Sequence, residues 1–188
     1  MSKEITQLPN KVLRLVAKEV PASSIPSSRI QSLISRMKAT LKATPDGVGL
    51  AAPQVGESLR IFIVSEEAEE IDRAGRPRRD EKGEIVKKPY EPREWNYYVF
   101  INPVIKNTSR KKFEDTEGCL SVPGKYGAVK RHEKLTLAYR DEAGKKITRG
   151  FSKFFSRVIQ HECDHLEGIL FIDKAEKVFS VRKDQNTP

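Results

Sequence analysis

The sequence has few of the residues that mark several common protein classes. It contains no apolar run near the ~18 residues that a membrane span requires, and its first residues lack the apolar stretch of a signal peptide. Only 7% of its residues are aromatic, which argues against a stacking platform for single-stranded nucleic acid. Its two cysteines, Cys119 and Cys163, allow at most one disulfide. We therefore expect a cytosolic protein, in which a metal-binding or catalytic role for cysteine is favoured over a disulfide.

Charged residues, by contrast, are abundant. Lys and Arg number 35 against 26 Asp and Glu, which gives a net charge of +9. Such a charge indicates either an anionic partner or simply a soluble basic surface. A chain of 188 residues is long enough to bury a core and fits one domain, so we predict a single domain over residues 1–188.

The spacing of apolar residues predicts the main elements. A helix is expected from residue 28 to about 44, ending at 45–47, because apolar residues recur at helical intervals: Ile30, Leu33, Ile34, Met37 and Leu41. Apolar or alternating runs predict strands, the third and fourth forming a hairpin, at 60–64, 97–105, 135–139, 145–148 and 169–172. The segment 5–25 is expected to be extended, with core contacts from Leu13, Leu15 and Val16.

Residues 66–94 interrupt this pattern. Of these residues 18 are charged, and three prolines and two glycines lie among them. We therefore predict a charged surface insertion here, either a loop or a hairpin around residues 84–86. Two further segments lack a clear element: residues 117–124 have the composition of a turn, and residues 178–188 form a polar tail that is expected to be frayed.

One stretch, with the sequence QHECDHL, stands out chemically. On a helix, His161 and His165 lie on one face and can bind one metal ion, while Glu162 can reach a water on that ion. The bare pattern also occurs on solvated helix surfaces. Here Phe154 and Val158 share the face of the histidines, so the imidazoles are expected to point into the core. A metal ion would explain their presence there.

Two histidines need a third ligand. His132 is the other histidine, and Cys119 lies in a segment that is free to approach the metal ion. Cys163 lies on the side of the helix opposite the histidines, where we expect a packed or exposed thiol. These residues favour a Cys/His/His site with an open fourth position. Three rivals remain at this point: a zinc endopeptidase, a copper electron-transfer site, and a nucleic-acid-binding module with a structural zinc. The first lacks a third ligand at the usual spacing, the second a suitable axial Met, and the third a reason for Glu162.

Three segments resemble a known family. They are GVGLAAPQ (47–54), EGCLS (117–121) and QHECDH (160–165), and in this order they resemble the three signature motifs of the peptide deformylases. The resemblance implies a hydrolase that removes the formyl group from the N-terminal formyl-methionine of newly synthesised proteins and releases formate. It also implies one divalent metal ion per chain. Fe²⁺ is expected as the native ion, and Zn²⁺, Ni²⁺ or Co²⁺ suit the same ligands.

The same resemblance implies roles for individual residues. Glu162 would be the general acid/base, and the metal ligands would be Cys119, His161 and His165. The developing oxyanion would be stabilised by the side-chain amide of Gln54 and the main-chain N–H of Leu120. The methionine side chain would enter a pocket formed by Val48, Gly49, Phe154 and Val158. The segment that carries Cys119 would be held by an ion pair between Glu117 and Arg131.

We expect an α+β fold, with antiparallel or mixed strands around a central metal-binding helix at 152–167 and the helix at 28–43 packed outside. The expected substrates are the N-formylmethionyl peptides of nascent chains. The basic surface suggests a transient contact with the ribosome, whereas no membrane and no specific DNA are expected as partners. The resemblance implies a cytoplasmic location of the bacterial type, with an organelle also open.

Overall fold

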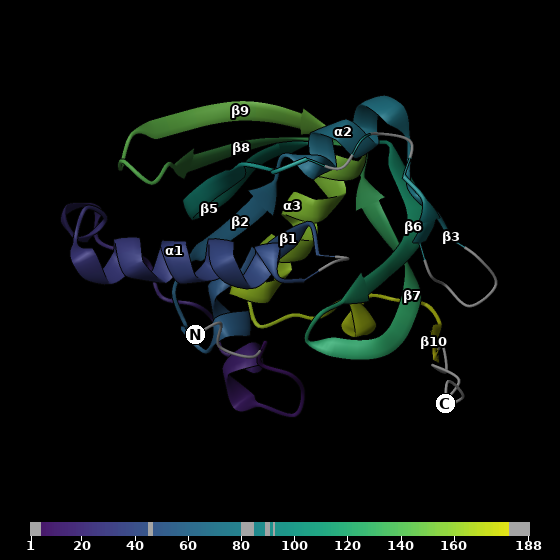
Figure 1. The fold of residues 1–188 in the computed structure, drawn as a ribbon, viewed down its shortest axis with the longest axis horizontal. Helices are drawn as coiled ribbons and strands as arrows, with labels where there is room; N and C mark the ends of the chain where they lie inside the picture. The colour runs from purple at the N-terminus through teal and green to yellow at the C-terminus, as the bar shows by residue number, and fades with distance from the viewer. Residues whose placement is uncertain (1–4, 45–46, 80–84, 89–90, 92, 181–188) are drawn as a thin grey trace.

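Two antiparallel sheets, a two-stranded ribbon and three α-helices form the part of the chain that the computed structural model describes, which comprises residues 5–44, 47–79, 85–88, 91 and 93–180 (Figure 1). The larger sheet has the order β1-β2-β5-β8-β9, with bounds Gly49–Ala51, Ile61–Ser65, Tyr97–Thr108, Lys134–Arg140 and Lys146–Ser152. The second has the order β10-β7-β6, with bounds Val178–Ser180, Val122–His132 and Lys112–Cys119. The ribbon pairs β3 (Arg78–Arg79) with β4 (Ile85–Lys87). This arrangement confirms the predicted α+β class.

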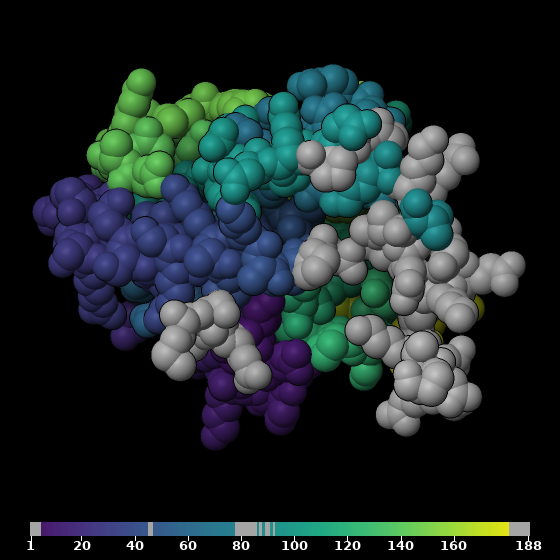
Figure 2. Space-filling view, viewed as in Figure 1, coloured from purple at the N-terminus to yellow at the C-terminus, as the bar shows by residue number. Residues whose placement is uncertain are grey.

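Strand β2 shows how the core is divided. Its five residues are all buried, and successive side chains point to opposite faces of the sheet. Ile61 and Ile63 belong to the core cluster that contains the apolar side of α1 (Ser28–Lys42). Phe62 and Val64 belong to the cluster that contains α3 (Lys153–Leu166). The two helices therefore cover opposite faces of the larger sheet, and the polar side of α1 lies on the surface shown in Figure 2.

Helix α3 has neighbours on several sides. It contacts β1, β2, β8 and β9 of the larger sheet and also β7 of the smaller one. Its N-terminus is capped by Asp72, whose two carboxylate oxygens accept hydrogen bonds from the main-chain N–H groups of Phe154 and Phe155 at 2.8 and 3.2 Å. The chain leaves its C-terminal end through Gly168, which has a φ of 71° and thus the left-handed conformation common after helices. The prediction of a helix at 152–167 is confirmed.

The charged segment 66–94 is more ordered than predicted. Its first part forms α2 (Glu67–Ala74), which packs against α3. Only Glu67, Ala68 and Ile71 of this helix are buried, and its other residues are mostly charged. The apolar pattern is therefore too short to indicate a helix, and the expectation of a loop was wrong for this part. The ribbon β3–β4 agrees with the alternative of a hairpin around residues 84–86, and residues 85–87 form its second strand. Residues 80–84, 89–90 and 92 lie outside the described residues.

Four other expectations need correction. Residues 169–172 form no strand, because the Asp173 side chain accepts a hydrogen bond from the Leu170 N–H and closes a 3₁₀ turn, η4 (Phe171–Asp173). Leu15 and Val16 are 52% and 64% exposed, since the short helix η1 (Lys11–Arg14) turns only Leu13 inward. The turn predicted at 117–124 is present only at residues 120–121, because the rest of the segment belongs to β6 and β7. Residues 178–180 of the expected frayed tail pair with β7, while 181–188 lie outside the described residues.

The remaining strand predictions are confirmed, with longer bounds except for β2, which is shifted by one residue, and the predicted hairpin is β8–β9. The helix predicted at 28–44 is α1, which begins after Ser27, a cap whose hydroxyl accepts from the Ile30 N–H. Its predicted stop at 45–47 falls partly on residues 45–46, which are outside the described part. None of the described helices has the length and apolar character needed to cross a membrane.

Candidate metal centre and active site

Three potential metal ligands converge beside α3. His161 and His165 lie one turn apart on this helix, with ring centroids 5.0 Å apart. Cys119, the last residue of β6, places its Sγ 3.3 Å from His165 Nε2. One donor atom from each of the three residues lies within 4.8 Å of the other two. A thiolate and two imidazoles this close together can hold a single ion such as Zn²⁺ or Fe²⁺.

The end of the β6–β7 hairpin positions Cys119. The strands stay in register up to Gly118, which pairs with Tyr126, and then shift so that Cys119 pairs with Val122. A Cβ at Gly118 would lie 2.8 Å from the Tyr126 ring, so this position has no room for a larger residue. The register shift turns the cysteine at the end of the strand toward the histidines of α3.

A buried carboxylate orients His161. Glu117 Oε2 accepts a hydrogen bond from His161 Nδ1 at 3.0 Å, which leaves the Nε2 lone pair for a metal ion. Arg131 binds both oxygens of this carboxylate, through Nε at 2.9 Å and Nη2 at 2.8 Å. Arg131 also donates to Asp164 at 2.5 Å, and Lys174 donates to the other oxygen of Asp164 at 2.6 Å. Burial opposes ionisation of Glu117, but the hydrogen bonds from Arg131 and His161 outweigh it and hold its pKa well below the usual range.

A second arginine reaches the same carboxylate. Arg157 Nη1 donates to Glu117 Oε1 at 2.6 Å. Arg157 is buried, and its guanidinium forms hydrogen bonds to both strands of the β6–β7 hairpin. Neither Arg157 nor Asp164 was predicted from the sequence as part of the site. A signal was present for the first, since Arg157 lies four residues before His161 and therefore on the inward face of the helix.

Glu162 lies deep beside the three ligands and is only 3% exposed. Among the described residues its Oε2 has no hydrogen-bond partner. Burial raises the pKa of Glu162 to about 7. Strand β1 lies directly against this side chain, because a Cβ at Gly49 would be 2.5 Å from Glu162 Oε1. Glycine is therefore required at position 49 for the carboxylate to keep its place.

Gln54 approaches the site from the 3₁₀ helix η3 (Ala52–Val55). Its Oε1 accepts a hydrogen bond from the Ala51 N–H at 2.9 Å, which fixes the orientation of the amide. Its Nε2 consequently faces Ser121 Oγ at 3.2 Å and Cys119 Sγ at 3.7 Å. Ser121, which is buried, was not singled out from the sequence although it lies in the second motif. Leu120 follows Cys119 directly and packs toward the α1 side of the core.

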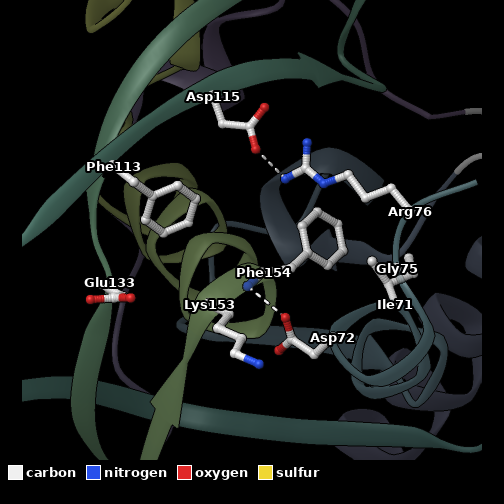
Figure 3. A pocket seen from close by; sticks show the side chains of 9 residues that line it. All are labelled: Ile71, Asp72, Gly75, Arg76, Phe113, Asp115, Glu133, Lys153 and Phe154. Carbon is white, nitrogen blue, oxygen red and sulfur yellow. Dashed lines mark hydrogen bonds and ion pairs between the residues drawn. The ribbon is translucent and has the colours of Figure 1, made fainter.

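The four residues predicted for a methionine pocket lie along α3 and β1. Val158 is buried, and its Cγ1 is 3.0 Å from the position of a Cβ at Gly49. Val48 and Phe154 are partly buried and pack against the same core cluster as Val158. Figure 3 shows the surroundings of Phe154, which lines a cavity of about 320 Å³ near the N-terminus of α3.

The cavity is also lined by Arg76, which belongs to the charged segment 66–94. The Arg76 guanidinium lies 4.9 Å from the centroid of the Phe154 ring and forms an ion pair of 2.5 Å with Asp115 of β6 (Figure 3). Arg76 follows α2 and leads into the β3–β4 ribbon. The residues next to the ribbon are thus attached to the body of the protein beside Phe154.

Cys163 lies outside the ligand cluster, as the helical wheel predicted. It is a free cysteine, half-buried, and packs against the core cluster on the α3 side of the larger sheet. Burial raises the pKa of its thiol to about 12. His132, the other histidine, is occupied elsewhere, since its Nδ1 lies 2.6 Å from the carbonyl oxygen of Ser109.

The electrostatics of the cluster favour a bound cation. Burial, reinforced by the neighbouring His161, lowers the pKa of His165 well below its usual value and keeps this imidazole neutral. Burial has the same effect on His161, but its interactions with Cys119, Glu117 and Glu162 outweigh it and raise the pKa of His161. These three side chains favour a positive charge at His161, which either a proton on the ring or a metal ion bound to it can supply. The donor set and the unpartnered Glu162 Oε2 both fit a metal with an open coordination position.

Comparison with known proteins agrees with this geometry. The family model for polypeptide deformylase matches residues 2–180. The chain belongs to the peptide deformylase family. Deformylases remove the formyl group from nascent chains, so the enzyme is a hydrolase of protein biosynthesis, and the rival endopeptidase, copper and structural-zinc interpretations are set aside.

Individual deformylases support this assignment. The chain is 41% identical to peptide deformylase 1A, chloroplastic/mitochondrial, of Arabidopsis thaliana over 91% of its own length, and it spans 60% of that protein. It is 38% identical to the peptide deformylase of Pseudothermotoga lettingae over 97% of its length and 90% of the relative's. A Met-Ala-Ser-bound class I type b deformylase from Acinetobacter baumannii matches with a TM-score of 0.74 and 34% identity, covering 93% of this chain and 99% of that one.

Proposed function

We propose that this deformylase cleaves the formamide bond of N-terminal formyl-methionine around one divalent ion held by Cys119, His161 and His165. The observation that carries the proposal is the convergence of these three donors, within 4.8 Å of one another, beside a buried glutamate. A single catalytic domain over residues 1–188, built around the metal-binding helix α3, is part of this proposal.

The ion would be Fe²⁺ in the native enzyme, with Zn²⁺, Ni²⁺ and Co²⁺ as possible substitutes, since all of them accept imidazole and thiolate ligands. When bound, the ion supplies Lewis acidity, which polarises a carbonyl oxygen and acidifies water at the open position. Cys119 would bind as a thiolate. His161 would bind through Nε2, because Glu117 occupies its Nδ1.

Glu162 would act as the general acid/base. Its carboxylate accepts a proton from the attacking water and later gives it to the leaving amine of methionine. The burial of Glu162 and its unpartnered Oε2 support this role, because the carboxylate is free to receive a proton. The main-chain contact with Gly49 holds the side chain on the ligand side of α3.

The developing oxyanion would be stabilised by Gln54 Nε2–H and the main-chain N–H of Leu120. Each donor contributes roughly 3 kcal/mol when it is aimed in advance at the position of the charge. The hydrogen bond from the Ala51 N–H to Gln54 Oε1 supports this role, since it directs the amide N–H groups toward Cys119.

The methionine side chain would lie between β1 and α3, in a pocket formed by Val48, Gly49, Phe154 and Val158. These residues lack polar side chains, Gly49 lies against Glu162 and Val158, and Val48 and Phe154 pack against the same core cluster as Val158. The substrates are then N-formylmethionyl peptides. The solved deformylase with bound Met-Ala-Ser supports this, because its ligand begins with methionine.

The basic charge of the chain would favour a transient contact with the ribosome, where nascent chains emerge. We propose a cytoplasmic location, in line with the bacterial relatives. A relative named as chloroplastic and mitochondrial makes an organelle the alternative.

Formate release from formyl-Met-Ala-Ser tests the proposed function. Protein reconstituted with Fe²⁺ under anaerobic conditions, or with Co²⁺, is expected to release one formate per peptide, and protein stripped by a chelator is expected to release none until metal is restored. Acetyl-Met-Ala-Ser serves as the matched substrate control and should remain intact. Formate release that persists after complete metal removal, or cleavage of an internal peptide bond, would contradict the proposal.

A further inference from the structure

Glu117 is held by more hydrogen bonds than one ion pair supplies. Oε1 accepts from Arg131 Nε at 2.9 Å and from Arg157 Nη1 at 2.6 Å. Oε2 accepts from Arg131 Nη2 at 2.8 Å and from His161 Nδ1 at 3.0 Å. Each oxygen therefore has one bond from Arg131 and one from α3, so the carboxylate spans two neighbouring turns of that helix.

Arg157 is itself fixed from several directions. Besides Glu117, its Nη1 donates to the Val129 carbonyl at 3.0 Å, and its Nη2 donates to the Phe113 carbonyl at 2.9 Å. Its guanidinium carbon lies 4.6 Å from the centroid of the Phe113 ring. Phe113 lies on β6 and Val129 on β7, so one side chain of α3 is bonded to both strands of the hairpin. A planar guanidinium with several donors can do this, whereas an ammonium group cannot cover the same partners in one plane.

The buried charges around Glu117 also balance. Arg131 and Arg157 carry two positive charges and Glu117 and Asp164 carry two negative ones, while Lys174, which is more exposed, also pairs with Asp164. Two arginines thus hold an ionised Glu117. Without Arg157, its remaining arginine would be Arg131, which also binds Asp164. A shared partner restrains the carboxylate less firmly, and the hydrogen bond to His161 depends on where the carboxylate lies.

We propose that Arg157 is a positioning residue for the metal site. It fixes the Oε1 side of Glu117, so that Oε2 meets His161 Nδ1 and the His161 ring presents Nε2 to Cys119 and His165. This inference rests on the proposed metal-binding role of His161 and extends it to a residue that contacts neither metal nor substrate. Arg157 acts on His161 through Glu117.

The test compares Arg157→Met, which removes the charge at similar volume, with Arg157→Lys, which keeps the charge but loses the planar fork. Apo-protein is titrated with Co²⁺ in competition with a chelator, and the visible spectrum of bound cobalt reports the ligand geometry. We expect Arg157→Met to bind Co²⁺ about 10- to 100-fold more weakly, the range found when groups behind metal ligands are removed. The spectrum should shift, kcat should fall more than KM changes, and Arg157→Lys should lie between the two proteins.

Arg149→Met is the matched control. Arg149 also donates to a glutamate, Glu69, at 2.9 Å, and its guanidinium lies 5.0 Å from the Phe151 ring, but it lies on β9 away from Glu117. Its loss should leave cobalt affinity and spectrum unchanged. A double-variant cycle with Glu117→Gln adds a second test: if Arg157 acts through Glu117, the combined loss of affinity is smaller than the product of the two single losses.

Several results would overturn the inference. Unchanged cobalt affinity and spectrum in Arg157→Met would do so, even if the variant melts at a lower temperature, because the role would then be structural only. Losses that multiply in the double variant would do so as well. If Arg157→Met does not fold, the test rests on Arg157→Lys. A cobalt spectrum and a Co²⁺ affinity equal to those of the wild type in that variant would contradict the proposal. Failure of the wild-type apo-protein to bind Co²⁺ would instead refute the proposed metal site itself.

Discussion

Replacing Gly49 with alanine tests the position of Glu162 with a single methyl group. The new Cβ would lie 2.5 Å from Glu162 Oε1 and 3.0 Å from Val158 Cγ1. Real Cβ atoms stay beyond 3.0 Å from such neighbours, so the carboxylate or the strand must move by about 0.5 Å. Gly49 is paired with Val64 in the larger sheet, which leaves the Glu162 side chain as the easier part to move.

The size of the effect follows from two terms. Overpacking of this kind costs about 1–3 kcal/mol of stability. A shift of 1 Å in a reacting group lowers the rate by about 10²-fold, so half that shift is expected to lower kcat by about 10-fold or somewhat more. Metal content should stay at the wild-type level, since the nearest neighbours of a Cβ at Gly49 belong to Glu162 and Val158 and not to the three donors.

The assay is formate release from formyl-Met-Ala-Ser, together with metal analysis and urea unfolding. Gly150→Ala is the matched control, because a Cβ at Gly150 would have its nearest neighbour, the Leu135 carbonyl oxygen, at 3.9 Å. In a Glu162→Gln background, Gly49→Ala should add little further loss. A wild-type kcat in Gly49→Ala would refute the reasoning that β1 fixes the carboxylate.

Three further predictions concern the site and the surface. Cys119→Ala should lose metal and activity together, whereas Cys163→Ser should be nearly silent; equal losses in both, by metal analysis and assay, would contradict the assigned ligand. Glu162→Gln should lower kcat/KM by ~10² to 10⁴-fold with unchanged metal stoichiometry, and loss of metal with an unchanged rate per metal would make Glu162 structural. Ribosome binding in a pelleting assay should weaken steeply with salt while activity on a short peptide changes little, and salt-insensitive binding would argue for solubility as the role of the charge.

The parts of the protein that the sequence predicts are those whose geometry is local. His161, Glu162 and His165 lie on one helix, so their spacing alone places them together. Helix α1 and strand β2 were predicted because each has a regular apolar pattern. Cys119 was favoured as the third ligand because the composition offers few other candidates, and the resemblance agreed. Its distance from the histidines could not be predicted, since nothing in its neighbourhood says how far a strand end is from a helix that begins 34 positions later.

The sequence does not predict which charged residues are buried, nor which apolar residues outside a regular pattern face the core. Arg157 is buried, yet in the sequence it is indistinguishable from the solvated charges around it, and Glu117 and Arg131 were paired only through the resemblance. For this reason Arg157 was missed, and residues 117–124 were expected to be a turn without the strands β6 and β7 on either side. Leu15 and Val16 show the converse, since their apolar character does not say which side of a short 3₁₀ helix faces the core.

The place of α3 between the two sheets has a consequence for how the enzyme matures. Every strand of the larger sheet, and both long strands of the smaller one, precede α3 in the sequence. A ribosome therefore finishes these strands before it makes the helix whose apolar residues pack against Phe62, Phe100 and Leu137. Until then their apolar faces lack that cover, and the pairing of distant segments is slow in any case. A protein that processes other newly made chains thus gains its own two clustered histidines only after the strands that α3 covers have been made.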